Sequence, residues 1–208
     1  MDDTPLYPVI MASTYSHALD QRDAPTYRHR MASTVLQVLS CSAIVAIGAQ
    51  LELKLPFTPV PITGQSLSVV IVGLLFGRNI AVSGVAAYLL EGASGLPVFS
   101  GGASGAHHLL GPTGGYLLGF LPAAFIAGAA KDRGITHSPL GIFLTVIASS
   151  IPIFGLGVVR LWSMFGDLST ALSSGLYPFI PGDFIKAILA SMAAPFCSLM
   201  PPRKDHLH

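Results

Sequence analysis

The segment from Met31 to Leu51 constrains this chain most, because it contains no Asp, Glu, Lys or Arg. As a helix it would be about 31 Å long, close to the hydrocarbon core of a bilayer at about 30 Å. Composition agrees: 51% of the residues are hydrophobic and 10% are charged, against about 25% charged in soluble domains. With a mean hydropathy of +0.65, the chain is predicted to be an all-α integral membrane protein.

Five more apolar segments follow the first, so we predict six transmembrane helices. The five lie at about 64–77, 80–95, 109–129, 140–165 and 182–200. The first two of them are short and are divided by Gly77-Arg78-Asn79. Polar side chains at mid-bilayer are costly, so we predict two short or tilted central helices. Residues 96–108 are rich in Gly and Ser, which predicts an outer loop. This loop is either exposed or re-entrant.

The polar ends of the chain are predicted to lie in the cytoplasm. Residues 1–30 are polar and contain three prolines, which favours a flexible N-terminal tail before a membrane domain over 31–200 and a short tail over 201–208. With this orientation Lys54 is the only basic residue in a predicted outer loop. The basic residues predicted inside are Arg22, Arg28, Arg30, Arg78, Lys131, Arg133, Arg203 and Lys204, as the positive-inside rule requires.

Several classes of function are disfavoured by what the sequence contains. A net charge of +1 does not supply the basic surface of a nucleic-acid partner. The sequence has no GxSxG, HExxH or Walker A motif, which excludes the corresponding hydrolases and ATPases. Cys41 and Cys197 stand in apolar runs and are interpreted as small hydrophobic residues. His107 and His108 lack a nearby Cys or carboxylate at metal-ligand spacing, so no metal site is predicted.

Two charged residues in the last apolar segment, Asp183 and Lys186, are the strongest candidates for a site. They are three residues apart and share a helix face, so they could form an ion pair. Alternatively, Asp183 could begin the helix, favoured by its dipole. Neither alternative accounts for both residues, and ionisable residues inside membranes are candidates for function. We therefore predict a ligand-binding role for the pair.

Other polar or small residues leave two interpretations open. Glu91 is predicted at the outer end of the third helix, as an interfacial or a functional residue. Arg160 is predicted near the outer end of the fifth helix, where it could snorkel to the surface. Gly115 and Gly119 are spaced for close helix packing. Ser42 and Ala46, with Ala49 one turn further, have similar spacing and would serve either internal packing or a membrane partner.

Four stretches in order make the chain resemble the BioY family, the biotin-specific substrate-binding subunits (S components) of energy-coupling factor (ECF) transporters. They are PFTPVPITGQ at 56–65, YLLEGASGLPVFSGG at 88–102, GPTGGYLLGF at 111–120 and PGDFIK at 181–186. The stretches extend over most of the predicted membrane domain. The residues before Met31 lie outside the resemblance.

The resemblance implies a six-helix protein of the bacterial plasma membrane that binds biotin at its outer face and releases it to the cytoplasm. It further implies a transmembrane coupling subunit and two cytoplasmic ATPases as partners, and neither enzymatic activity nor a cofactor. One alternative is a solitary transporter of biotin or a related vitamin without ATPases. Another is an intramembrane enzyme that uses Asp183 together with Glu91.

The resemblance also assigns residues to the site by motif position. The substrate-binding candidates are Asp183, Lys186, Gln65, Tyr116, Gly101 and Gly102. The family can place an amide after the two glycines, whereas this chain has Ala103-Ser104, so Ser104 or His107 is predicted to substitute. The small residues Ser42, Ala46 and Ala49 of the first helix are expected to face the coupling subunit.

Overall fold

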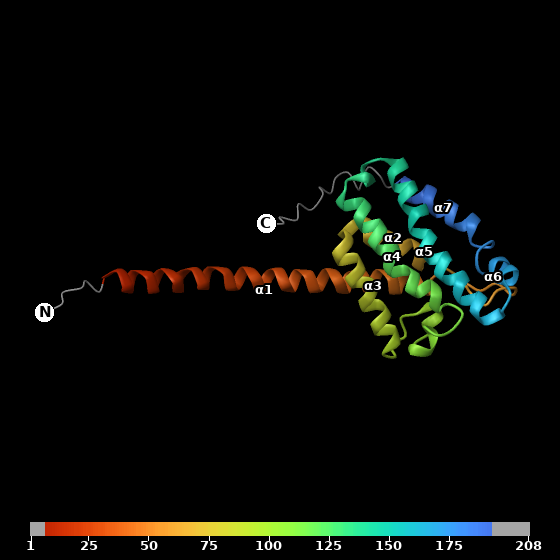
Figure 1. Ribbon diagram of the computed structural model, residues 1–208, viewed down its shortest axis with the longest axis horizontal. Coiled ribbons are helices and arrows are strands. Elements are labelled where there is room, and N and C mark those ends of the chain that lie inside the picture. Colours follow the sequence, from red (N-terminus) through yellow and green to blue (C-terminus); the bar gives the residue numbers. More distant parts are fainter. Residues whose placement is uncertain (1–6, 193–208) are drawn as a thin grey trace. The chain divides into compact units, whose positions relative to one another are not determined.

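The computed structural model describes residues 7–192 of the chain, with side chains from residue 29 onward. The chain divides between Leu36 and Gln37 into two units. In its described part the first unit consists of the beginning of helix α1 (Tyr7–Gln50). The second unit contains the end of α1 and all other elements, and it is mainly helical as predicted (Figure 1).

The second unit follows α1 with a short hairpin and then six more α-helices in the described range. The α-helices are α2 (Gln65–Phe76), α3 (Arg78–Ala93), α4 (Gly114–Asp132), α5 (Pro139–Phe165), α6 (Leu168–Gly175) and α7 (Ile180–Ser191). Strands β1 (Glu52–Leu53) and β2 (Ile62–Thr63) pair antiparallel, with Glu52 opposite Thr63. The 3₁₀ turns are η1 (Ser100–Gly102), η2 (Ala106–His108) and η3 (Ile135–His137).

Helix α1 begins much earlier than the sequence analysis predicts. We expected a flexible tail over residues 1–30, whereas the structure is helical from Tyr7 onward. The segment includes good helix formers such as Ala12, Ala18 and Leu19. Extending an existing helix adds one hydrogen bond per residue without a new nucleus, except at Pro25, which has no N–H, so these residues continue the helix of the apolar segment. The cytoplasmic location of this part stays a prediction.

Three described helices are long and apolar enough to cross a membrane: His29–Gln50 within α1, α4 and α5. Helices α2 and α3 have 12 and 16 residues, so they are about 18 Å and 24 Å long. Both are shorter than a bilayer core, in agreement with the predicted short central helices. The sixth predicted segment, 182–200, ends outside the described residues, and its described part belongs to α7.

The break between α2 and α3 is stabilised by the end of α4. Gly77 separates the two helices with φ +78°, a conformation that favours glycine. The Asp132 carboxylate accepts a hydrogen bond from the Arg78 backbone N–H at 3.2 Å. The neighbouring Lys131 ammonium donates to the Leu75 carbonyl. Adjacent residues of α4 thus satisfy backbone groups at the end of one helix and the start of the next.

We expect Asp132→Ala to destabilise this junction, because the Arg78 N–H loses its acceptor. A lost cap costs about 1 kcal/mol, which lowers the thermal unfolding midpoint by about 2–4 °C in a chain of this size. Thermal unfolding of the purified protein in detergent measures the shift. Asp132→Asn is the matched control, since it retains an acceptor oxygen and should unfold near the wild-type temperature. Equal midpoints for all three proteins would contradict the capping role.

Helices α4 and α5 form the most extensive helix pair, and α7 packs on the other side of α5 (Figure 1). The predicted close packing at Gly115 and Gly119 is confirmed, and the neighbour is α5. A Cβ at Gly115 would lie 2.2 Å from the Leu156 carbonyl oxygen, and one at Gly119 would lie 2.7 Å from the Ile153 Cα. Glycine therefore permits a backbone approach that any side chain would prevent.

Helix α6 was not among the predicted elements. It starts with Asp167, whose carboxylate accepts from the backbone N–H of Thr170 at 2.7 Å and from its hydroxyl at 2.6 Å. This N-cap pattern is a local signal that could have revealed the helix. The Thr58 hydroxyl donates to the Ser174 carbonyl at 2.7 Å. The loop between β1 and β2 is thereby attached to the end of α6, just before α7.

Candidate functional site

Four of the predicted site residues line one cavity in the second unit, which we call the central cavity. Asp183 and Lys186 come from α7, Gln65 from the first turn of α2, and Tyr116 from α4. The cavity has a volume of about 70 Å³. The other described residues that line it are Val60, Pro61, Ile62, Thr63, Ser66, Thr113, Leu117, Phe120, Ile153, Phe154, Phe179 and Gly182. Polar groups therefore converge within mostly apolar walls, as is usual for small-molecule sites.

The Lys186 side chain reaches from α7 to the start of α2. Its Nζ donates to the Thr63 carbonyl at 3.0 Å and to the Ser66 hydroxyl at 2.9 Å. An ammonium has three N–H donors, so these two contacts hold it in place and leave one donor for a ligand. A cation held at the wall of a largely apolar cavity is suited to bind a carboxylate.

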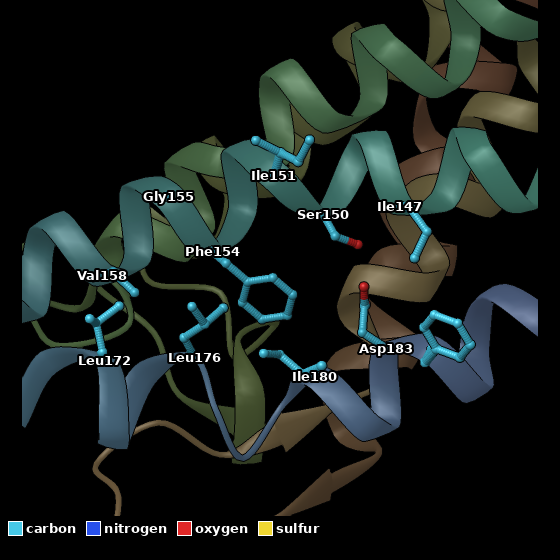
Figure 2. A pocket seen from close by; sticks show the side chains of 11 residues that line it. Ile147, Ser150, Ile151, Phe154, Gly155, Val158, Leu172, Leu176, Ile180 and Asp183 are labelled. Atoms are coloured by element: carbon cyan, nitrogen blue, oxygen red, sulfur yellow. The ribbon is translucent and has the colours of Figure 1, made fainter.

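Asp183 is buried, with 8% of its surface exposed. The one ion pair among the described residues joins Lys54 to Glu52 at 3.0 Å, so the alternative of an Asp183–Lys186 ion pair is wrong. Asp183 lies in the first turn of α7 and is not its N-cap, which is Phe179. Figure 2 shows its carboxylate turned toward the Ser150 hydroxyl of α5. The two charged residues of PGDFIK thus contact different neighbours.

Gln65 is buried and already partly engaged with the protein. Its Nε2 donates to the Tyr88 hydroxyl, and its Oε1 accepts from the Thr63 hydroxyl at 3.1 Å. A side-chain amide offers two donors and one acceptor oxygen with two lone pairs. One donor and one lone pair therefore remain for a ligand in the central cavity, and the existing bonds fix the orientation of the amide.

Tyr116 has a different role for each part of its side chain. Its hydroxyl donates to the Gly175 carbonyl at 2.7 Å, which attaches α4 to the end of α6. Its ring packs near Phe154 and Phe179, with centroid distances of 6.5 Å and 6.3 Å. These three rings form an aromatic wall of the central cavity. We therefore assign the ring to the site and the hydroxyl to the scaffold.

The predicted loop residues Gly101, Gly102 and Ser104 do not line the central cavity. Both glycines have positive φ, +66° and +73°. The Ser100 hydroxyl next to them donates to the Glu52 carboxylate. The hydrogen bonds from Ser100 and Lys54 lower the pKa of Glu52, so this carboxylate is ionised at neutral pH. The loop is thereby attached to the hairpin that leads to Thr63.

Two aromatic residues connect this loop to the site, and the sequence analysis missed both. Phe99 is 2% exposed, and its ring packs edge-on against Tyr88 at a centroid distance of 5.6 Å. Tyr88 in turn holds Gln65. Phe99 also faces His108, which stacks beside His107. Phe99 could have been found from the sequence, because a large apolar side chain within a Gly-rich loop is expected to pack against a buried partner.

Arg160 makes specific contacts that the sequence did not predict. Its guanidinium donates to the carbonyls of Leu110 and Gly111, the latter at 3.3 Å. These carbonyls lie just before α4, so Arg160 attaches the end of the Gly-rich loop to α5. Backbone carbonyl oxygens of the protein thus accept hydrogen bonds from the guanidinium group.

The small residues of α1 are mostly turned into the protein. Ser42 and Ala49 are buried, at 2% and 0% exposure, and the Ser42 hydroxyl donates to the Glu91 carboxylate of α3. Ala46 is half-buried, whereas its neighbour Ile47 is 66% exposed. The expectation that Ser42 and Ala49 face a partner is inconsistent with this burial. Glu91 is a structural contact between α1 and α3.

Comparison with known proteins gives a consistent result. Residues 19–201 match the family described as the BioY family. The biotin transporter BioY of Rhizobium etli is 36% identical over 165 residues, which cover 76% of this chain and 88% of that protein. The biotin transporter BioY of Thermotoga maritima is 36% identical over 157 residues, with 74% and 88% covered.

A solved structure is also similar to this fold. It is described as the S-component for biotin from an ECF-type ABC transporter. The TM-score is 0.73 and the sequence identity is 31%, with 83% of this chain and 94% of that chain covered.

Proposed function

The chain belongs to the BioY family, and on that premise we propose that it binds biotin as the S component of an ECF-type transporter. The family consists of transporter components, so the chain is not an enzyme. The observation that carries the proposal is the central cavity, where Asp183, Lys186 and Gln65 meet an aromatic wall. The names of the relatives suggest biotin as the ligand, and the residues of this cavity have the charges, hydrogen-bonding groups and apolar surface that biotin requires.

Biotin has three chemically distinct parts, and the cavity has a counterpart for each. The carboxylate of biotin would pair with Lys186 by a charge-assisted hydrogen bond. The ureido ring, with two N–H donors and one carbonyl, would bind the Asp183 carboxylate and the Gln65 amide. The thiophane ring and alkyl chain would lie against the aromatic wall that includes Tyr116 and Phe154.

Binding requires the central cavity to widen. Sites for small ligands usually have about 300–1,000 Å³, and the central cavity has about 70 Å³. Lys186 can release Thr63 and Ser66 and turn toward a carboxylate, because its side chain is long and flexible. The end of α6, which precedes the segment that carries Phe179, can also move, since Thr58 and Tyr116 attach it to the loop before β2 and to α4 by one hydrogen bond each.

We further propose six membrane crossings, made by α1, α2, α3, α4, α5 and α7, with both termini in the cytoplasm of a bacterial cell. Biotin would enter from the outer face and leave toward the cytoplasm. A transmembrane coupling subunit and two ATPases would supply the energy, which agrees with the absence of a Walker A motif from this sequence. Biotin uptake in cells without a coupling subunit would instead indicate a solitary transporter.

Calorimetric titration of biotin into the purified protein tests the proposed ligand. We expect saturable binding of one biotin per chain. Desthiobiotin, which lacks the sulfur but keeps the ureido ring and the carboxylate, should bind in the same site and compete. Absence of heat with both compounds would exclude biotin as the ligand.

We propose that the coupling subunit docks on the face of α1 that contains Ala43 and Ile47, both exposed. Ala43→Trp should abolish co-purification of the coupling subunit, because a large ring on this face prevents close helix approach. Biotin titration should be unchanged, since Ala43 is not among the residues that line the central cavity. Leu144→Trp on α5, at a side chain that is 54% exposed, is the control and should retain the subunit. Retention by Ala43→Trp would place the docking face elsewhere.

A further inference from the structure

A second hollow, the lateral groove, lies between α5 on one side and α6 and α7 on the other (Figure 2). Its volume is about 410 Å³. Within residues 29–192, Ser150 and Asp183 are the only polar side chains that line it. Figure 2 shows the oxygens of these two side chains turned toward each other, with apolar side chains along the rest of the groove. The groove is therefore almost entirely a hydrocarbon surface.

The rim of the lateral groove is exposed and apolar. Ile151 is 69% exposed, Phe184 is 52% exposed and Ile180 is 47% exposed. Since α5 is long and apolar enough to cross a membrane, this side of the protein faces lipid. A void there would lose dispersion contacts, and water would find few polar partners. The groove must therefore be filled by hydrocarbon.

The dimensions of the groove fit one lipid chain. Along α5 it extends from Ile147 to Val158, which is about 16 Å of helix. One leaflet contributes about 15 Å of hydrocarbon thickness, half of the bilayer core.

The lateral groove and the central cavity share a wall. Asp183 and Phe154 line both hollows. On the cavity side the Phe154 ring packs against Tyr116 and Phe179, with centroid distances of 6.5 Å and 6.1 Å. On the groove side the ring lies near Leu176 and Ile180, which line the same hollow (Figure 2). An occupant of the groove would therefore contact the back of the aromatic wall.

We propose that the lateral groove binds one acyl chain of a membrane phospholipid, and that this chain supports the aromatic wall from behind. The inference goes beyond the binding of biotin and does not depend on which ligand enters the central cavity. The acyl chain is part of the working structure of the protein, because it fills the space next to Phe154.

Photo-crosslinking in phosphatidylcholine vesicles tests this proposal. The probe is a phosphatidylcholine with a diazirine in one acyl chain, and labelled peptides are mapped by mass spectrometry. The vesicles contain this chain without a coupling subunit, so that Leu39 and Ile47 of α1 are exposed to lipid. We expect about tenfold more label in the groove than at these two residues, as for a site that binds tenfold more tightly than the open surface. Excess biotin should leave this label unchanged, since biotin binds on the other side of the wall.

Gly155→Leu provides the decisive variant. A Cβ at Gly155 meets no atom within 4 Å, so the new side chain can enter the groove without a clash. We expect the label in the groove to fall to the level on α1. Gly182→Leu, which fills the central cavity instead, is the matched control and should keep the excess. Equal label on both faces of the wild type, undiminished label in Gly155→Leu, or cross-links to a second copy of the chain would overturn the proposal.

Discussion

Lys186→Met lowers the affinity for biotin by a factor of about 10 to 100. The ammonium is the one cation among the described residues that line the central cavity. Charge-assisted hydrogen bonds contribute about 1.5–3 kcal/mol, which corresponds to this range. Methionine keeps much of the length and volume of lysine, so the variant removes the charge with little loss of packing. Calorimetric titration of biotin into both proteins measures the change.

A neutral ligand separates loss of charge from loss of structure. The wild type should prefer biotin over biotin amide, because the amide has no carboxylate for Lys186. The Lys186→Met variant should bind the two compounds with similar affinity. Asp183→Asn, which removes the negative charge at the acceptor for the ureido N–H groups and replaces one of its two oxygens by an N–H donor, should weaken biotin and the amide alike. If Lys186→Met keeps both the affinity and the preference, the carboxylate does not bind at this residue.

Gly182→Leu should abolish biotin binding, with a loss of at least about 100-fold, or about 2.8 kcal/mol. Gly182 lines the central cavity, and a Cβ added there meets no atom within 4 Å. The leucine side chain can therefore enter the cavity without displacing the backbone, and it occupies the space that biotin needs. Leucine also has a higher helix propensity than glycine by about 1 kcal/mol, so the fold of α7 should be retained.

The matched control is Gly155→Leu, because it is the same substitution at another open position. Gly155 lines the lateral groove but not the central cavity. Its variant should bind biotin like the wild type, because the leucine side chain takes the place of the acyl chain beside Phe154. Thermal unfolding of both variants checks that they are folded. Normal binding by Gly182→Leu would show that biotin binds elsewhere, whereas loss of binding in both would indicate that the groove takes part in ligand binding.

The sequence predicted most of the helices because their signals are local. An apolar run without charges marks 31–51, and Gly77-Arg78-Asn79 marks the division between α2 and α3. The sequence also indicated Asp183 and Lys186 as site candidates, because burying charge in a membrane segment is costly. Gln65 and Tyr116 entered through the resemblance to a family. All four residues line the central cavity, while their roles in binding stay proposals.

Contacts between distant segments were not readable from the sequence. The use of Lys131 and Asp132 to satisfy backbone groups of α2 and α3 requires the end of α4 to lie at their junction. The same holds for Arg160 and the carbonyls before α4. The sequence shows each of these residues only as a charged residue near a helix end. Its partner could not be predicted, because the partner is far away in the chain.

The sequence by itself determined a helical membrane protein, the approximate limits of its apolar helices and the presence of two charged residues in the last one. Only the tertiary structure decided where each side chain points. Neighbouring residues of a helix differ in direction by about 100°, so Ser42 is buried against Glu91 while Ala43 is exposed. Likewise Lys186 reaches α2 while Asp183 faces α5. Hydrophobicity sets which segments enter the membrane, and the rotation and packing of the helices set which side chains meet.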